Sequence, residues 1–153
     1  MASKEHHRGL LRGSIWEVLS ALRTFNEKIL EPYAQKQGLT FLQSRVLMGI
    51  YHGKITTVGG LAAHASLYQG NASNLCKRLE RQGFIRRERG TADERVVHLT
   101  LTEKGYAAAE NISRRMRTLD EFIEENAKED MQALRDGAKA FLKIVDLINE
   151  NGL

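Results

Sequence analysis

The stretch of residues 58–105 constrains the fold of this chain most strongly, because its patterning changes from helical to extended within one short segment. Residues 70–82 have the apolar spacing of an amphipathic helix, and Gly83 is typical of the residue that follows a last helical turn. A shorter helix, capped by Thr57, is expected before it, and residues 66–68 are expected to form the turn between the two. The buried face of the longer helix is expected to carry Ala72, Leu75, Cys76 and Leu79.

Two extended segments follow, over residues 84–89 and 95–101. Apolar and polar residues alternate in the second, as expected of a strand with one buried face. The connecting loop, residues 90–94, is too polar to be buried, so the two strands predict a protruding hairpin. Helix, turn, helix and hairpin in this order predict a winged helix-turn-helix. The fold class is therefore mainly α with a small β-hairpin wing (α+β).

A long helix is predicted before this stretch, over residues 10–36, where apolar residues recur at steps of three and four. Pro32 lies inside the run and is expected to end or kink the helix near Glu31, because proline has no backbone N–H. Gly38 is a plausible stop.

A capping box begins the next predicted helix, residues 41–52. The Thr40 hydroxyl can accept a hydrogen bond from the backbone of Gln43, and the Gln43 side chain can reach back. Gly53 is expected to close this helix, and residues 54–56 could add one small strand.

Residues 103–125 and 128–149 are predicted to form the last two helices, with Thr102 as a cap. Apolar residues in the final helix recur at alternating steps of three and four, which is typical of a narrow seam packed against another helix. Either the first helix of the same chain or a second chain could cover the seam. Its residues are Met131, Leu134, Ala138, Phe141, Val145 and Ile148.

Composition excludes several classes of protein. The chain has 153 residues, of which 42% are hydrophobic and 27% charged, and no apolar run reaches the roughly 18 residues that a membrane helix needs. One cysteine excludes an internal disulfide framework, and the polar N-terminus predicts a cytoplasmic protein. No Walker loop, nucleophile elbow or metal-ligand spacing is present, so neither an enzyme nor a cofactor or metal is predicted.

Charge is distributed unevenly along the chain. The net charge is +4, and acidic residues outnumber basic ones only after residue 105. A polyanionic partner would therefore be attracted to the first two-thirds.

The helix of residues 70–82 carries polar and basic side chains opposite its apolar face. Amide and hydroxyl groups near a helix start can reach base edges in a DNA major groove, and basic groups further along can bind phosphates. A solvated amphipathic helix would have the same pattern, so the helix alone does not decide between the two interpretations. The candidate DNA contacts are Asn71, Ser73, Asn74, Lys77 and Arg78.

Arginines on the predicted hairpin favour the DNA interpretation. Arg87, before the loop, and Arg95, after it, are further candidate DNA contacts. An arginine at a loop tip can enter a minor groove and sense its width. Asp93 could hold the Arg95 guanidinium in a bidentate pair, although a surface ion pair of little energetic value has the same spacing.

The sequence resembles the MarR family of bacterial transcription regulators. The resemblance is carried by Leu61-Ala62, by the segment from Leu79 to Arg87, by Asp93-Glu94-Arg95 and by the segment from Leu99 to Gly105. It is strongest over residues 39–105. Departures from the family pattern at Tyr68, Gly70 and Asn74 affect the expected operator preference.

Such a resemblance implies a homodimer whose two winged domains bind successive major grooves of a near-palindromic operator. The recognition helices would then lie about 34–36 Å apart. It implies DNA contacts at the five residues named above and a wing-tip contact at Arg95 supported by Asp93. It divides the chain into residues 1–38 and 106–153 for dimerisation and 39–105 for DNA binding.

The resulting prediction is a sequence-specific, ligand-responsive transcriptional repressor. Relatives often bind small phenolic or amphipathic effectors, and Trp16, Tyr33, Phe41, Tyr51 and His52 could line such a pocket or could be plain core or surface. Two alternatives remain: a winged-helix protein-interaction module that does not bind DNA, and an oxidant sensor that uses the Cys76 thiol.

Overall fold

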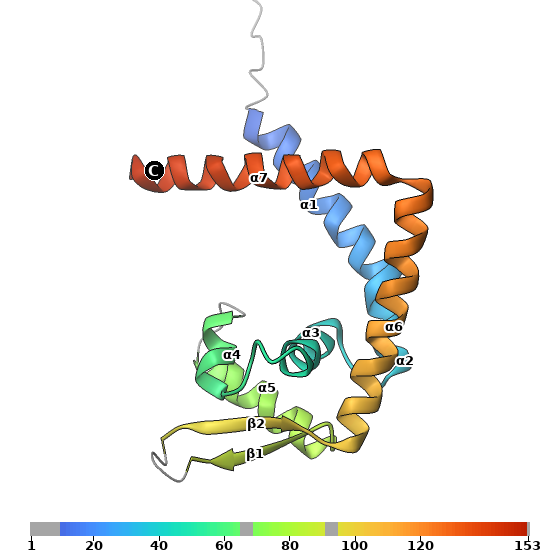
Figure 1. Ribbon diagram of the computed structural model, residues 1–153. Helices are drawn as coiled ribbons and strands as arrows, with labels where there is room; N and C mark the ends of the chain where they lie inside the picture. Colours follow the sequence, from blue (N-terminus) through green and yellow to red (C-terminus); the bar gives the residue numbers. More distant parts are fainter. Residues whose placement is uncertain (1–9, 65–68, 91–94, 153) are drawn as a thin grey trace, which may run out of the picture. The chain divides into compact units, whose positions relative to one another are not determined.

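The computed structural model describes residues 10–64, 69–90 and 95–152, and it confirms a mainly helical chain with one antiparallel hairpin (Figure 1). The chain divides into two compact units, residues 1–112 and 113–153. The functional division into residues 1–38, 39–105 and 106–153 stays a prediction.

The predicted helix over residues 10–36 is one helical run with an interruption before its proline. Helix α1 spans Leu10–Phe25, a π-helical turn spans Asn26–Leu30, and α2 spans Glu31–Lys36. Pro32 cannot donate to the carbonyl of residue 28, and its ring would clash with that carbonyl in a regular helix. The wider π turn accommodates this defect. Gly38, with φ of 72°, follows the last turn as predicted.

Helix α3, Phe41–Tyr51, begins with the predicted capping box. The backbone N–H of Gln43 donates to Thr40 Oγ1 at 3.3 Å, and the backbone N–H of Thr40 donates to Gln43 Oε1 at 2.9 Å. Both bonds satisfy donors that a helix N-terminus otherwise leaves unpaired. Gly53 closes α3 with a φ of 68°, also as predicted.

Helix α4 spans Val58–His64, and its backbone N–H at Gly60 donates to Thr57 Oγ1 at 2.9 Å, so the predicted cap is confirmed. Leu61 is fully buried, which offsets the poor helix propensity of two adjacent glycines. The small strand that residues 54–56 could have added is reduced to an isolated bridge between Thr57 and His98. The predicted turn over residues 66–68 lies outside the described residues.

Helix α5, Gln69–Arg81, ends in a Schellman motif at Gly83, which has φ of 78°. The N–H of Gly83 donates to the Glu80 carbonyl at 2.8 Å, and the N–H of Phe84 donates to the Leu79 carbonyl at 2.9 Å. The chain then turns directly into the hairpin.

The hairpin consists of β1, Ile85–Arg89, and β2, Val97–Leu101. The strands pair antiparallel, with Ile85 opposite Leu101 and Arg89 opposite Val97. Both predicted strands are therefore confirmed, each shorter at its start than expected.

The hydrophobic core of the first unit draws on every element from α3 to β1. Its largest fully buried side chains include Leu47, Ile55, Leu61, Leu79 and Ile85. Burying a leucine or isoleucine stabilises a fold by about 1.5–3 kcal/mol. This shared core fixes the orientation of α5 against α3 and the hairpin.

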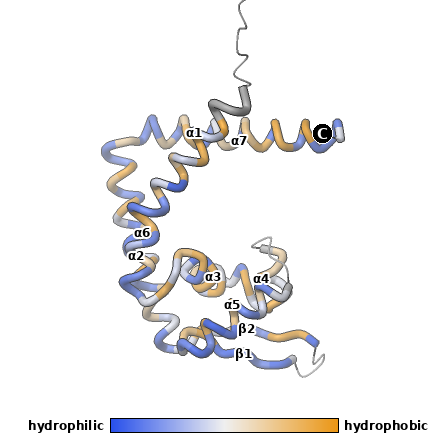
Figure 2. Tube along the Cα trace, turned by 180° about the vertical axis from the view of Figure 1, so that it is seen from behind, coloured by the Kyte–Doolittle hydropathy of each residue, from blue (hydrophilic) through white to orange (hydrophobic). Residues whose placement is uncertain are grey.

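Helix α6, Glu103–Asn126, crosses from the first unit into the second, and α7 spans Lys128–Glu150. No side chain is buried in the described part of the second unit, residues 113–152. Apolar positions recur along α7 (Figure 2), and Leu134, Phe141 and Val145 of the predicted seam are exposed in the single chain. None of the helices, within the described residues, is both long and apolar enough to cross a membrane.

Candidate nucleic-acid interface

Helix α5 has one fully buried face and one solvent-exposed face. Ala72, Cys76 and Leu79 are each 0% exposed, as the sequence predicts, whereas Leu75 is only half-buried at the edge of that face. The buried side chains hold α5 to the core, so the opposite face is presented to solvent in a fixed orientation.

That exposed face carries most of the predicted DNA-contacting side chains. Asn71 and Asn74 lie near the start of α5, and Lys77 and Arg78 lie in its second half; all four are exposed. Ser73 is half-buried at the boundary between the two faces. We call the set of Asn71, Asn74, Lys77, Arg78 and Arg81 the polar face of α5.

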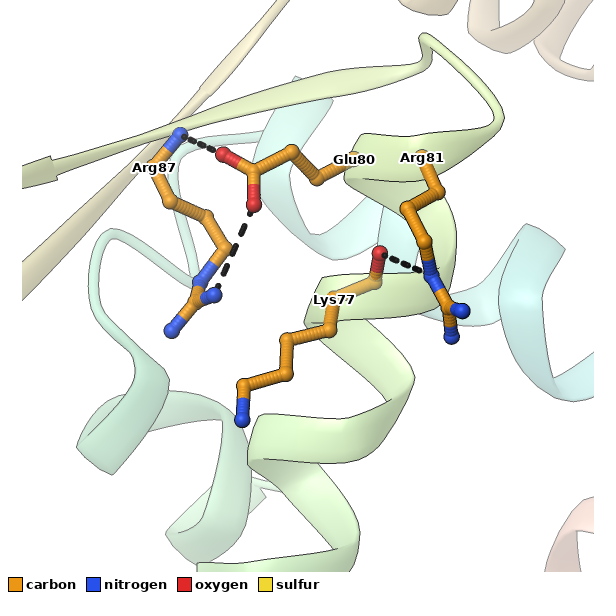
Figure 3. A network of polar contacts seen from close by, with 4 residues as sticks. All are labelled: Lys77, Glu80, Arg81 and Arg87. Atoms are coloured by element: carbon orange, nitrogen blue, oxygen red, sulfur yellow. Dashed lines mark hydrogen bonds and ion pairs between the residues drawn. The ribbon is translucent and has the colours of Figure 1, made fainter.

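Arg81, the last basic residue of α5, is placed differently. The Arg81 Nε donates to the Lys77 carbonyl at 3.4 Å, which directs this guanidinium along its own helix (Figure 3). A cation beside the last carbonyls also interacts favourably with the helix dipole.

Arg87 is held inward on β1. Its Nη1 lies 3.5 Å from Glu80 Oε2, and its backbone N–H donates to Glu80 Oε1 at 3.2 Å. The Arg87 side chain is 19% exposed, while its neighbours Arg86 and Glu88 are exposed. A DNA-contacting role for Arg87 stays a prediction, and in this structure its charge faces a carboxylate.

At the wing tip, Arg95 is exposed just before β2. Asp93, its predicted support, lies outside the described residues. The proposed pairing of Asp93 and Arg95 therefore stays a prediction.

The C-terminal end of α5 is fastened to two other helices. Buried Gln43 on α3 donates from Nε2 to Gln82 Oε1 at 2.8 Å. Lys104 on α6 donates to the Gln82 carbonyl at 2.7 Å, and Thr102 Oγ1 donates to the Gly83 carbonyl at 2.6 Å. The bonds from Lys104 and Thr102 pair backbone carbonyls just beyond the end of α5, and the bond from Gln43 pairs the Gln82 side-chain amide. Together they fix the direction of α5.

Sequence reasoning missed these positioning residues. Thr102 was assigned only as the cap of α6, a cap that its acceptance of the Gly105 N–H at 3.0 Å confirms, whereas its bond to the Gly83 carbonyl was not predicted. Gln43 was assigned only to the capping box. One signal was available: Glu80 stands in the last turn of α5, where a carboxylate opposes the helix dipole and therefore needs a compensating partner.

The structure brings together only part of the predicted effector pocket. The Tyr51 and His52 rings lie 5.2 Å apart, and Tyr106, which the prediction did not include, lies 5.3 Å from Tyr51. Tyr33 donates to the Asn111 carbonyl at 3.2 Å. Trp16 is exposed on α1.

Other residues of the described part of the chain line surface depressions. One lies along α1 and the π turn and includes Phe25 and Ile29, and another lies at the α6–α7 corner and includes Asp120 and Arg135. Neither is lined by any of the five predicted pocket residues, which include half-buried Phe41. The assignment of an effector pocket stays a prediction.

Cys76 lies in the core and not at the surface. Burial raises the pKa of its thiol from 9.0 to about 11; the Arg87 charge lowers the pKa and the Glu80 charge raises it, both by less than burial does. A protonated thiol is a poor nucleophile at neutral pH. The geometry therefore disfavours the oxidant-sensor alternative.

Comparison with known proteins places residues 28–112, more than half of the chain, in the family described as transcriptional regulator SarA/Rot. The chain is also 34% identical over 73 residues to the HTH-type transcriptional regulator SarZ of Staphylococcus haemolyticus, which covers 48% of this chain and 50% of SarZ. The chain thus spans about half the length of the curated relatives it first matches. These proteins are transcriptional regulators and not enzymes.

Solved structures agree on the fold. A crystal structure of a MarR family transcription regulator has a TM-score of 0.73 at 21% identity, covering 89% of this chain and 93% of that protein. Streptococcus pneumoniae FabT, crystallised in complex with DNA, has a TM-score of 0.71 at 20% identity, covering 88% of this chain and 99% of FabT. The predicted MarR-type winged-helix fold is confirmed, and the chain belongs to the SarA/Rot family of transcriptional regulators.

Proposed function

We propose that this chain binds double-stranded DNA as a homodimer and represses transcription from a near-palindromic operator. The observation that carries the proposal is the two-faced character of α5. Its buried face is packed into the core, and its polar face holds two amides followed by three basic side chains, all exposed. This arrangement fits a recognition helix in a major groove.

Within this proposal, different residues have different roles. Asn71, Ser73 and Asn74 lie in the first half of α5, where side chains reach base edges and specify sequence. Lys77 and Arg78 bind phosphates, which contribute affinity without sequence information. Asp93 and Arg95 supply the wing-tip contact in the minor groove.

The homodimer is inferred from apolar surface that one chain leaves uncovered. Val18, Leu22 and Phe25 on α1 are 52%, 54% and 43% exposed, and Leu134 and Phe141 on α7 are 56% and 44% exposed. Apolar surface of this extent on long helices is typical of a partner interface. A second copy would supply matching seams, as closed two-fold symmetry requires. Residues 1–38 and 106–153 then form the dimerisation region, with 39–105 between them.

A small-molecule effector fits the same scheme. The aromatic contacts of Tyr51 with His52 and Tyr106 provide flat apolar surface beside a polar ring, which suits a phenolic compound. We propose that an effector would change operator affinity by favouring one separation of the two recognition helices. Such a regulator works in the cytoplasm, where it meets DNA.

The direct test compares two labelled duplexes in a binding titration: the upstream region of the protein's own gene and a shuffled duplex of the same length and composition. The wild-type chain is expected to prefer its own upstream region. Asn74→Ala should reduce that preference, whereas Lys77→Gln should weaken binding to both duplexes and reduce the salt slope by about 1.

The protein-interaction alternative makes the opposite prediction. A wild-type chain that binds neither duplex at 50 mM salt, while remaining folded and dimeric, would contradict DNA binding and favour that alternative.

A further inference from the structure

The inner face of the hairpin carries an arginine where an apolar residue would be expected. On β1, Ile85 is 1% exposed, and Arg87, two residues later, points to the same side, whereas Arg86 and Glu88 are exposed. Successive side chains of a strand alternate between its faces. A charged group on the inner face must be paired, because removing it from water is otherwise costly.

Glu80 supplies the partner from α5. One carboxylate oxygen accepts the Arg87 backbone N–H, and the other faces the Arg87 guanidinium, as Figure 3 shows. Among the described residues, these are the polar contacts recorded between α5 and β1. The Glu80 carboxylate points away from Arg81, the nearer arginine in sequence.

The position of Glu80 in α5 indicates that its pairing with Arg87 stabilises the contact between α5 and β1 and not the helix itself. It lies in the last turn of α5, where the helix dipole disfavours a negative charge. Where a residue is unfavourable at its position in a helix, a contact with another element commonly compensates for the cost. Here the compensation is the bond to β1.

The guanidinium is also poorly placed to reach DNA. The Arg87 Nε is buried and has no acceptor among the described residues, and the side chain is largely covered. Moving it outward to a phosphate would leave the Glu80 carboxylate unpaired beside the DNA backbone, where two negative charges repel.

We propose that Glu80 and Arg87 form a brace that sets the angle between α5 and the hairpin, which makes both positioning residues for DNA binding. The proposal rests on the proposed function. It assigns to Arg87 a role different from the DNA contact predicted from the sequence. The brace lets the polar face of α5 and Arg95 engage adjacent grooves at the same time.

The test measures affinity for the gene's own upstream duplex between 50 and 200 mM salt, in dimeric full-length protein. The variants are Glu80→Gln, Arg87→Gln and the exchange Glu80→Arg/Arg87→Glu, with Glu80→Arg and Arg87→Glu as the single reversals. Lys77→Gln is the matched control, because it removes one exposed cation from the polar face of α5.

Arg87→Gln is expected to lower affinity roughly tenfold, within the range of coupling between residues of one ion-pair network, with the salt slope unchanged. Lys77→Gln should reduce that slope by about 0.9, as the loss of one phosphate contact does. Glu80→Gln should weaken binding although it removes a negative charge. The exchange should recover part of the affinity lost by each single reversal.

Opposite changes in the salt slope and in the affinity would contradict the proposal that Glu80 and Arg87 form a brace. If Arg87→Gln reduces the salt slope as Lys77→Gln does, and Glu80→Gln strengthens binding, Arg87 contacts phosphate and Glu80 only restrains it.

A second measurement, which does not depend on DNA binding, tests the brace separately from the proposed function. Hydrogen exchange of the Arg87 backbone amide should accelerate in Glu80→Ala and stay slow in Glu80→Gln, because glutamine keeps the acceptor. If wild-type protein binds no DNA, this exchange result still decides whether Glu80 holds the hairpin. Equal exchange in Glu80→Ala and wild type would refute it.

Discussion

Gly105 at the start of α6 lies directly against the carbonyl group of Phe84, so that a Cβ added at Gly105 would overlap the Phe84 oxygen. The obstacle is backbone and cannot rotate away as a flexible side chain could. Gly105 also donates its N–H to Thr102. The junction of α5, the hairpin and α6 therefore tolerates only glycine at this position.

Gly105→Ala is accordingly expected to destabilise the fold by about 3 kcal/mol, at the upper end of the cost of overpacking, because the backbone must move. Thermal or urea unfolding measures the change. Gly59→Ala is the control, since a Cβ at that exposed helical position meets nothing within 4 Å. It should be neutral or stabilising by up to about 1 kcal/mol. Equal effects of the two substitutions would contradict the overlap at Gly105.

Thr102 is expected to stabilise the fold through the hydrogen bonds of its hydroxyl group and not through the packing of its methyl group. It donates to the Gly83 carbonyl and accepts from the Gly105 N–H, which joins the end of α5 to the start of α6. Thr102→Val should cost about 1–3 kcal/mol, because it leaves part-buried polar partners unpaired. Thr102→Ser keeps the hydroxyl and should lose much less. Urea unfolding of the two variants distinguishes the roles, and similar losses would show that the methyl group matters more.

Arg95→Ala is expected to weaken binding to the upstream duplex markedly, by about tenfold or more if the wing contact is worth over 1.4 kcal/mol. The variant should remain folded and dimeric, since Arg95 is exposed. Binding titrations with circular dichroism as the folding control measure both effects. Unchanged affinity in a folded variant would show that the wing-tip assignment is wrong.

Phe141→Glu in the α7 seam is expected to weaken self-association, because it places a charge in a surface that a second copy would bury. Sedimentation velocity over a range of concentrations measures the monomer fraction. Lys139→Gln is the control on the same helix, because Lys139 is off the seam and pairs at the surface with Asp136. A dimer equally stable in both variants would exclude this seam from the interface.

Cys76 is expected to react slowly with a thiol reagent at pH 7.5, and peroxide should not change operator affinity. Its raised pKa also predicts a pH effect on stability. The folded state keeps its proton up to about pH 11, whereas the unfolded thiol loses it near 9.0. This contribution to stability is therefore complete below about pH 9 and is lost between 9 and 11. Urea unfolding of wild type and Cys76→Ala over this range measures it, and parallel pH curves would contradict the shift.

Much of the fold could be predicted because its signals are local. Thr40 with Gln43, and Gly83 after α5, satisfy or end a helix through neighbours in the chain, so residue type and spacing reveal them. The buried face of α5 follows in the same way from helical periodicity. The polar face, including Asn71 and Lys77, is then the remainder of the helix surface, and its exposure could be predicted too.

Other features depended on contacts between distant parts of the chain. From sequence, strand alternation places Arg86 and Arg87 on opposite faces, but it does not show that Glu80 of α5 meets Arg87 on the inner face. Likewise, nothing local shows that Gln43 would reach Gln82, because 39 positions separate them. The residues of the predicted effector pocket were also difficult to choose from sequence, since residue type says little about which aromatic rings come into contact.

The sequence by itself determined the order of elements, most of their ends and the face that α5 buries, since caps and periodicity act over a few residues. Only the tertiary structure decided which charges are free to meet DNA and which hold the wing in place. The physical reason is that a charged side chain takes its role from the groups packed around it, and for Arg87 that group is Glu80 on another element.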